Sequence, residues 1–398
     1  MQPPLAGITV VALEQAVAAP FATRQLVDLG ARVIKIERPL VGDFARHYDV
    51  TVHGEASYFV WLNRGKESVE LDIKTFDGRW LLDALIAGAD VFVHNLVPGS
   101  VERMGLDAAT LRAARPALIH CSISGYGTAG PYQFKKAYDL LVQCETGMLM
   151  TTGTPEAPCK VGVSIADIAT GMYAYSGILT ALFSRERTGD GATIDVAMID
   201  ALGEWMSQPT YVSVYGDEAP RRTAARHASI APYGPYLAAD GGLVFLGVQS
   251  DREWTLLCDM VLHRPDLATD PRFMRNTDRV VNNDAITPLI EQAFGSSTSD
   301  EVAALLDRVG LANARLRTPA EFAEHPQILA RDRRRAVPTP GGEMDALLPP
   351  VNIRGLEPIM GAVPSLGEHT DAVRAEFTRA PTQGERDSPA DDRLPPPS

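Results

Sequence analysis

The chain contains 398 residues, of which 45% are hydrophobic and 22% charged, so its composition excludes a disordered or coiled-coil protein for most of its length. Its formal net charge of -13 at pH 7 argues against nucleic acid or an anionic membrane as a partner, because both attract strongly positive surfaces. The 4 cysteines show neither CxxC nor metal-ligand spacing, which excludes a disulfide framework and a cysteine-bound metal ion.

The opening segment does not resemble a targeting sequence. It lacks a basic region, and Glu14, Gln15 and Pro20 interrupt its apolar stretch. No run of 18 apolar residues occurs elsewhere in the chain. We therefore expect neither a signal peptide nor a membrane span, and we expect the protein to be cytoplasmic.

Strand and helix patterns alternate along the first 200 residues. Apolar runs rich in β-branched residues predict buried strands, and helical runs that end at Gly or Pro lie between them. This alternation predicts a large Rossmann-like, doubly wound α/β domain with a parallel sheet and ligands at the carboxyl ends of its strands. The predicted strands span residues 7–13, 31–37, 67–72, 89–95 and 117–124, and the predicted helices span 19–30, 76–88 and 108–116.

The second half of the chain predicts a smaller α+β domain. A long helix at 167–187 and a strand and helix within 191–206 complete the large domain, and turn residues then crowd the sequence. A strand at 242–248 and helices at 252–261, 287–295 and 299–310 follow. The predicted organisation is a large domain at 1–206 to which 330–378 return, linkers at 207–235 and 316–345, a small domain at 236–315 and a disordered tail at 379–398.

Several familiar catalytic motifs are missing from the sequence. The first strand-helix turn reads LEQAVAAP and lacks GxGxxG, which argues against a nicotinamide enzyme. There is no HExxH, GxSxG or P-loop, so carboxylate chemistry remains. Asp167 stands between an apolar run and the long helix, where its carboxylate would face the crevice. On spacing alone, a simple helix cap is the better-supported interpretation of Asp167.

A longer pattern reverses that interpretation. The segment VGVSIADIATGMYAYSGILTALFSRERTGDGATIDVAMIDA resembles the region of the catalytic aspartate in family III CoA transferases, the CaiB/BaiF group that includes formyl-CoA transferase and α-methylacyl-CoA racemase. Other blocks of this family are resembled in the same order. The first is the segment from GITVVAL to IERP together with GDFAR, and it is followed by NRGKESVELDIKT, VFVHNLVPGSVERMGLD and SISGYGTAGPY. The resemblance is strong over residues 5–250 and implies that Asp167 is the catalytic nucleophile, acting without a metal ion.

The resemblance also implies which residues bind coenzyme A and how the protein assembles. No tightly bound cofactor is expected, since the CoA thioester is itself a substrate. Family members form interlocked homodimers, which we therefore expect here. For each candidate named next, the alternative is that it is a solvated surface charge or a packed residue with no contact to CoA. The candidates for CoA binding are Val17, Ala18, Arg38, Lys74, Asn95, Arg103, Met104 and Lys136.

One position separates a transferase from a racemase. Tyr138 stands where the racemase branch has a histidine, and a phenol with a pKa near 10 is a poor shuttle for an α-proton. The resemblance therefore favours a transferase in which Tyr138 and Asp139 position the acyl group, although a buried tyrosine and a capping aspartate are the alternatives. An α-methylacyl-CoA racemase and a non-catalytic acyl-CoA-binding protein remain open as other functions.

The substrate is predicted from departures within the family. Val17 replaces the glutamine of formyl-CoA transferases, and their glycine-rich loop is missing, which argues against oxalate or formate. The sequence looks more like transferases that move CoA from succinyl-CoA to C4–C5 dicarboxylates such as itaconate, mesaconate, malate or citramalate. A distal carboxylate needs a cationic partner. The candidates for that partner are Arg46, His47, Arg226 and His227.

Overall fold

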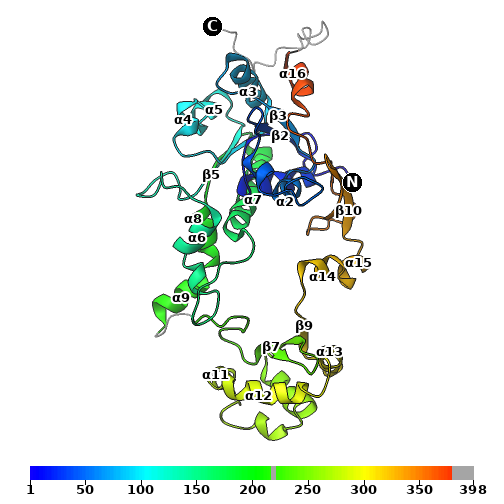
Figure 1. Ribbon diagram of the computed structural model, residues 1–398. Helices are drawn as coiled ribbons and strands as arrows, with labels where there is room; N and C mark the ends of the chain where they lie inside the picture. Colours follow the sequence, from blue (N-terminus) through cyan, green and yellow to red (C-terminus); the bar gives the residue numbers. More distant parts are fainter. Residues whose placement is uncertain (217–220, 379–398) are drawn as a thin grey trace. The chain divides into compact units, whose positions relative to one another are not determined.

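The computed structural model describes residues 1–216 and 221–378 (Figure 1). The chain divides into two compact units. The first unit comprises residues 1–146, 162–207 and the chain from 332 onward, and the second comprises 147–161 and 208–331. Of the described helices, none is both long and apolar enough to cross a membrane. The predicted disordered tail at 379–398 lies outside the described residues.

A six-stranded parallel sheet forms the centre of the first unit. Its strand order is β3-β2-β1-β4-β5-β6, so the order reverses beside β1 as in doubly wound folds. The predicted α/β class is confirmed, and ligands are expected near the carboxyl ends of the central strands. The strands are β1 (Thr9–Leu13), β2 (Arg32–Glu37), β3 (Glu67–Glu70), β4 (Val91–His94), β5 (Ile119–Ser124) and β6 (Thr193–Ala197).

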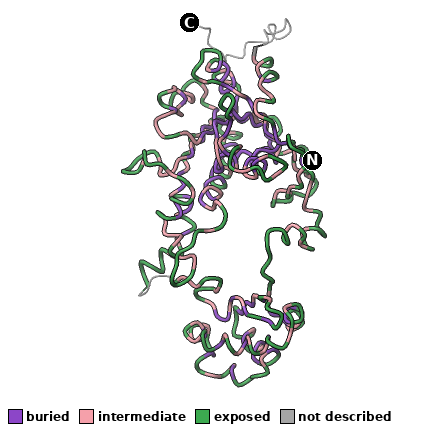
Figure 2. Tube along the Cα trace, viewed as in Figure 1, coloured by how far each residue is buried: buried purple, intermediate pink, exposed green. Residues whose placement is uncertain are grey.

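Helices cover both faces of this sheet, because alternate side chains of each strand point to opposite sides. Val10 and Ala12 of β1 pack with helices α1 (Ala18–Asp28) and α7 (Ile165–Thr188). Val11 and Leu13 point the other way, towards α3 (Phe76–Gly88) and α16 (Thr370–Thr378). Figure 2 shows that buried residues concentrate along these central strands. Apolar burial on both faces explains why the strands read as continuous hydrophobic runs.

A glycine sets the spacing between α1 and α7. A Cβ atom built on Gly171 would lie 2.6 Å from the carbonyl oxygen of Ala18, which is too close for any other residue without a shift. Asp167 precedes Gly171 by four residues and so occupies the same face of α7. The close approach therefore brings α7 against the start of α1 one helical turn after Asp167.

Shorter elements and a returning segment complete the first unit. The backbone N–H of Glu70 donates to Thr370 Oγ1, and the backbone N–H of His369 donates to the Ser68 carbonyl. These two hydrogen bonds tie α16 to β3. The shorter elements are η1 (Phe44–His47), α2 (Ser57–Asn63), α4 (Ser100–Arg103), α5 (Ala108–Ala114), α6 (Asp139–Glu145), α8 (Met198–Trp205) and the antiparallel pair β10 (Arg334–Thr339) and β11 (Gly342–Leu347).

The second unit is an antiparallel sheet packed with short helices around its own apolar core. Trp254, Phe273 and Phe294 are at most 1% exposed in that core. Capping boxes begin two of its helices, at Ser250 with Glu253 and at Thr298 with Glu301. Its elements are η2 (Met148–Met150), β7 (Tyr233–Leu237), β8 (Leu243–Gly247), α10 (Asp251–Leu256), η3 (Leu257–Val261), η4 (Pro265–Ala268), α11 (Asn276–Val281), α12 (Asn283–Phe294), α13 (Ser299–Val309) and β9 (Ala312–Arg315).

The segments predicted as linkers contain short helices and strands. Helix α9 (Ser207–Tyr215) and part of β7 occupy the described part of 207–235. Helices α14 (Pro319–Ala323) and α15 (Pro326–Ala330) and the strand β10 lie within 316–345. Proline is compatible with the first turn of α14 and α15, because the N–H that it lacks has no partner within a helix there.

Candidate active site

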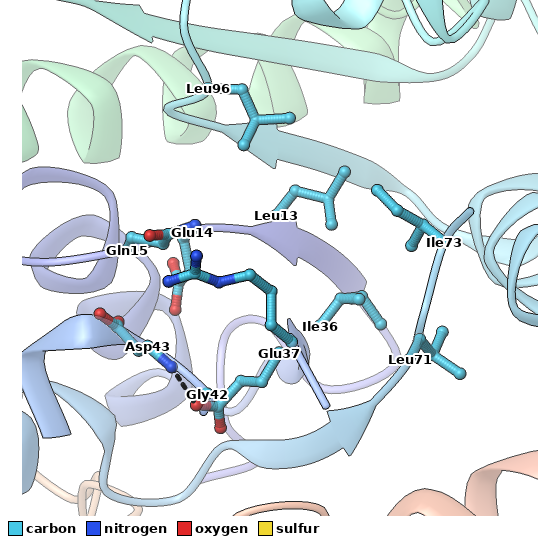
Figure 3. Close-up of a pocket in the computed structure, with 11 residues that line it drawn as sticks. Leu13, Glu14, Gln15, Ile36, Glu37, Gly42, Asp43, Leu71, Ile73 and Leu96 are labelled. Atoms are coloured by element: carbon cyan, nitrogen blue, oxygen red, sulfur yellow. Dashed lines mark hydrogen bonds between the residues drawn. The ribbon is translucent and has the colours of Figure 1, made fainter. Parts of the chain in front are cut away.

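A cavity of about 140 Å³ lies at the carboxyl ends of the central strands (Figure 3). It opens where the strand order reverses, as expected for ligand binding in a doubly wound sheet. Apolar side chains supply one wall, and the polar groups come from the turns after β1 and β2. The lining residues are Leu13, Glu14, Gln15, Ile36, Glu37, Arg38, Gly42, Asp43, Leu71, Ile73 and Leu96.

Asp167 lies in the first turn of α7 and is half-buried. The helix begins after Ser164, whose side chain makes no capping bond to it. Asp139, from the first turn of α6, supplies the cap instead. Its Oδ1 atom accepts the backbone N–H of Ala166 at 2.8 Å and that of Asp167 at 3.4 Å. The capping role proposed for Asp167 as an alternative thus belongs to Asp139.

The surroundings of Asp167 change its acidity. Burial disfavours the ionised carboxylate, and the negative charge of Asp139 adds to this effect, so the pKa of Asp167 rises from 3.8 to about 7. A carboxyl group with a pKa near the operating pH is typical of reactive sites rather than of structural caps. Asp167 therefore has both the position and the acidity of a functional group.

Two tyrosines that the sequence did not single out stand beside the start of α7. Tyr58 Oη lies 3.1 Å from Ser164 Oγ, and the rings of Tyr48 and Tyr58 are 5.7 Å apart, edge to face. Burial and the charges of Asp43 and Asp167 raise the pKa of Tyr48 to about 12, so its hydroxyl keeps its proton. The sequence pattern that could have indicated these tyrosines is the cluster of aromatic residues within 44–61. Such a cluster is equally typical of a hydrophobic core.

The turn between β1 and α1 is held by side chains from other strands. Asn95, directly after β4, accepts the N–H of Gln15 at 3.0 Å and donates to the Gln15 carbonyl at 2.8 Å. Val17 and Ala18, which begin α1, are each 3% exposed. Asn95 was predicted to contact CoA directly, and its observed partner is the turn that carries Val17 and Ala18.

The other candidates for CoA binding are spread along the exposed edge of the unit. Arg38 is exposed and lines the cavity. Lys74, Arg103 and Lys136 are also exposed, and Arg103 donates to Ser100 Oγ at 3.0 Å. Met104 ends α4 and packs partly against the apolar core.

The cationic candidates for a substrate carboxylate have different surroundings. Arg46 donates to both carboxylate oxygens of Glu37, at 2.8 and 2.7 Å, and lies 3.6 Å over the Phe59 ring. Burial would raise the pKa of Glu37, but Arg46 and Lys35 lower it to about 2, so this pair is ionised. A substrate carboxylate would have to displace Glu37 from Arg46. His47 is exposed, with Nε2 3.0 Å from the Val41 carbonyl oxygen.

Behind the cavity lies a buried ionic network. Lys66 Nζ lies 2.6 Å from Glu14 Oε1, and Lys35 Nζ lies 2.8 Å from Asp43 Oδ2. All four side chains are buried, and Thr23 Oγ1 donates to the second oxygen of Glu14 at 2.6 Å. Burial opposes ionisation of Glu14, but the two lysines hold its pKa below the ordinary value. The network fixes the polar floor of the cavity.

Comparisons with known proteins identify this arrangement. The family model of CoA-transferase family III matches residues 5–370. An acetyl-CoA:oxalate CoA-transferase from Acetobacter aceti is 36% identical over 94% of this chain and 96% of its own. A succinyl-CoA:glutarate CoA-transferase from Mus musculus is 33% identical over 82% of this chain and 75% of its own.

A solved structure agrees with these sequence relationships. The crystal structure of a CAIB/BAIF family protein from Brucella suis superposes with a TM-score of 0.83 at 35% identity. It covers 95% of this chain and 100% of its own. The match of sequence and fold over nearly the whole chain confirms the resemblance stated above, and the chain is a member of CoA-transferase family III, a transferase enzyme.

Proposed function

We propose that this enzyme moves CoA from an acyl-CoA donor, succinyl-CoA in particular, to a small dicarboxylate through covalent intermediates on Asp167. The observation that carries the proposal is the half-buried position of Asp167 in the first turn of α7, beside Asp139, with a pKa of about 7. Such a carboxyl group is ionised in a substantial fraction of molecules at neutral pH, and its burial leaves the anion weakly solvated and reactive.

The chemistry balances without another reactant. The Asp167 carboxylate attacks the thioester carbonyl, the C–S bond breaks, and CoA thiolate leaves behind a mixed anhydride. The thiolate then attacks the aspartyl carbonyl, which releases the donor acid and forms an aspartyl-CoA thioester. The acceptor carboxylate repeats these two steps in reverse order. Each step exchanges one acyl bond for another, and Asp167 ends as a free carboxylate.

The acceptor is proposed from relatives and from the sequence. We propose a C4–C5 dicarboxylate such as itaconate, mesaconate, malate or citramalate, and the relative named for glutarate supports a five-carbon diacid. Oxalate, which the sequence argued against, belongs in the test because a 36% identical relative is named for it. That His47, Arg226 or His227 meets the distal carboxylate stays a prediction.

The experiment traps the covalent intermediate, and transfer of CoA to the C4–C5 dicarboxylates and to oxalate is then measured to identify the acceptor. The protein is incubated with succinyl-CoA, quenched with hydroxylamine and mapped by mass spectrometry. Asp200, an exposed carboxylate in the first turn of α8, provides the matched control. Modification at Asp167 in the wild type and in Asp200→Ala, and its loss in Asp167→Ala, supports the proposal. Absence of any modified carboxylate with several acyl-CoA donors contradicts it, and deuterium exchange at C2 of a 2-methylacyl-CoA would then indicate a racemase.

The quaternary structure is a separate proposal. We propose a homodimer, supported by the assembly that the family resemblance implies. Size-exclusion chromatography with light scattering at micromolar concentration tests it. A mass of twice 42.9 kDa supports the dimer, and a mass of 42.9 kDa contradicts it.

A further inference from the structure

The turn that leads into α1 contains an unusual backbone conformation. Ala16 has a φ of 62°, in the left-handed region that residues with a Cβ atom disfavour. The turn joins β1 to Val17, the residue that caps α1 without any side-chain hydrogen bond to the helix. The first N–H groups of a helix have no partner within the helix, so their direction depends on how this turn is held.

A buried carboxylate from another turn holds Ala16 in this conformation. Asp43 Oδ1 accepts the N–H of Ala16 at 3.0 Å and that of Ala45 at 2.9 Å. The other oxygen of Asp43 accepts Lys35 Nζ at 2.8 Å. Asp43 is 1% exposed and Lys35 is 0% exposed, so a carboxylate that turned away would leave buried Lys35 with only its longer contact to Glu14, at 3.4 Å.

We propose that Asp43 is a positioning residue for CoA binding: by holding Ala16 in the left-handed region it fixes the turn whose Glu14 and Gln15 line the cavity, and with it the Val17 and Ala18 amides. This inference rests on the proposed function in naming CoA as the ligand, and on the predicted contact of Val17 and Ala18 with CoA. Asp43 acts through the backbone of the turn, and its own carboxylate is occupied by Ala16, Ala45 and Lys35.

Electrostatics and positioning predict opposite results when the charge of Asp43 is removed. CoA is an anion, so losing a negative charge beside the cavity would by itself strengthen binding. The single oxygen of asparagine could still accept the N–H groups of Ala16 and Ala45, so alanine, which has no acceptor, is the informative change. If Asp43 acts by positioning, the turn relaxes in Asp43→Ala and binding weakens in spite of the lost negative charge.

Glycine at position 16 provides the decisive control. Glycine adopts the left-handed region without steric cost, so Ala16→Gly removes the need for the clamp. We expect Asp43→Ala to raise the KM for acyl-CoA and the Kd for free CoA roughly 5- to 30-fold, with kcat nearly unchanged. The double variant Ala16→Gly/Asp43→Ala should recover most of that affinity relative to Ala16→Gly alone. Its thermal stability should stay as low as that of Asp43→Ala, because Lys35 keeps only its 3.4 Å contact with Glu14.

The measurements are steady-state kinetics and isothermal titration calorimetry with free CoA, with folding checked by circular dichroism. Asp43→Glu, which keeps the charge beside Lys35 but displaces the carboxylate, gives the same test if the alanine variant unfolds. Unchanged affinity in the Asp43 variants, or a double variant that binds CoA as weakly as Asp43→Ala, overturns the inference. If the variants show these changes in CoA affinity but the wild type transfers no CoA, the proposed function is contradicted and the inference about Asp43 stands.

Discussion

Asp139 caps the helix that carries Asp167, although the two residues are 28 positions apart in the chain. The Asp139 carboxylate accepts the N–H groups of Ala166 and Asp167 and thereby brings a negative charge next to a second carboxyl group. Burial and, in addition, the negative charge of Asp139 disfavour the ionised form of Asp167 and raise its pKa to about 7. The contact with Asp139 thus fixes the start of α7 and makes Asp167 a weaker acid.

The first prediction concerns the pH dependence of transfer. Attack requires the ionised form of Asp167, so kcat/KM should rise with pH through about 7 and level off above it. Asp139→Asn keeps an oxygen for the cap but removes the charge, so the midpoint should move to lower pH. The measurement is kcat/KM from about pH 5 to about pH 9. Glu145→Gln, at the other end of α6, is the control, and a midpoint unchanged by Asp139→Asn would contradict the assignment.

The second prediction concerns stability. Because the pKa of Asp167 lies above its ordinary 3.8, the folded protein binds more protons than the unfolded chain between these two values. The contribution of Asp167 to stability therefore falls as pH rises from about 4 to about 7. Asp167→Asn should be more stable than the wild type above pH 7 by about 1–3 kcal/mol, discounted for partial exposure, and nearly equal below pH 4. Urea unfolding at several pH values checks this, with Asp200→Asn expected to show no such trend.

The third prediction concerns the exposed cation at the cavity. Arg38→Ala should raise the KM for acyl-CoA about 10- to 100-fold, because a charge-assisted hydrogen bond to a phosphate is lost. The KM of Arg38→Lys should lie between those of the wild type and Arg38→Ala, since lysine keeps the charge but not the planar guanidinium group. Arg79, which pairs with Asp83 on the surface of α3, provides the control: Arg79→Ala should leave KM unchanged. Equal effects at both positions would remove Arg38 from the site.

The fourth prediction concerns the buried network. Lys66→Met leaves Glu14 without its nearest partner, and should lower the free energy of unfolding by about 3–5 kcal/mol. Replacing both residues with apolar ones should cost less than the sum of the single changes, because no unpaired charge remains. Urea unfolding measures both effects. Arg79→Ala breaks an exposed ion pair and should lower the free energy of unfolding by less than about 1 kcal/mol. If Lys66→Met lowers it by no more than Arg79→Ala does, the buried network does not stabilise the protein.

The sheet could be predicted because its strands are buried on both faces. A continuous run such as VVAL has no polar face, which leaves few alternatives to a central parallel strand. Helix α2 was missed for the opposite reason. Its sequence SYFVWLN favours a strand by local propensity, but Phe59 and Val60 pack against Val337 and Val363, and this tertiary contact decides for a helix.

The sequence by itself determined the α/β class, the family and, through the family resemblance, the importance of Asp167. Only the tertiary structure decided that Asp139 caps α7, that Glu37 occupies Arg46 and that Asp43 holds Ala16. The physical reason is the range of the forces involved. Hydrophobic patterning acts through the local period of strand and helix, whereas hydrogen bonds and charges act over a few ångströms between residues that only the folded chain brings together.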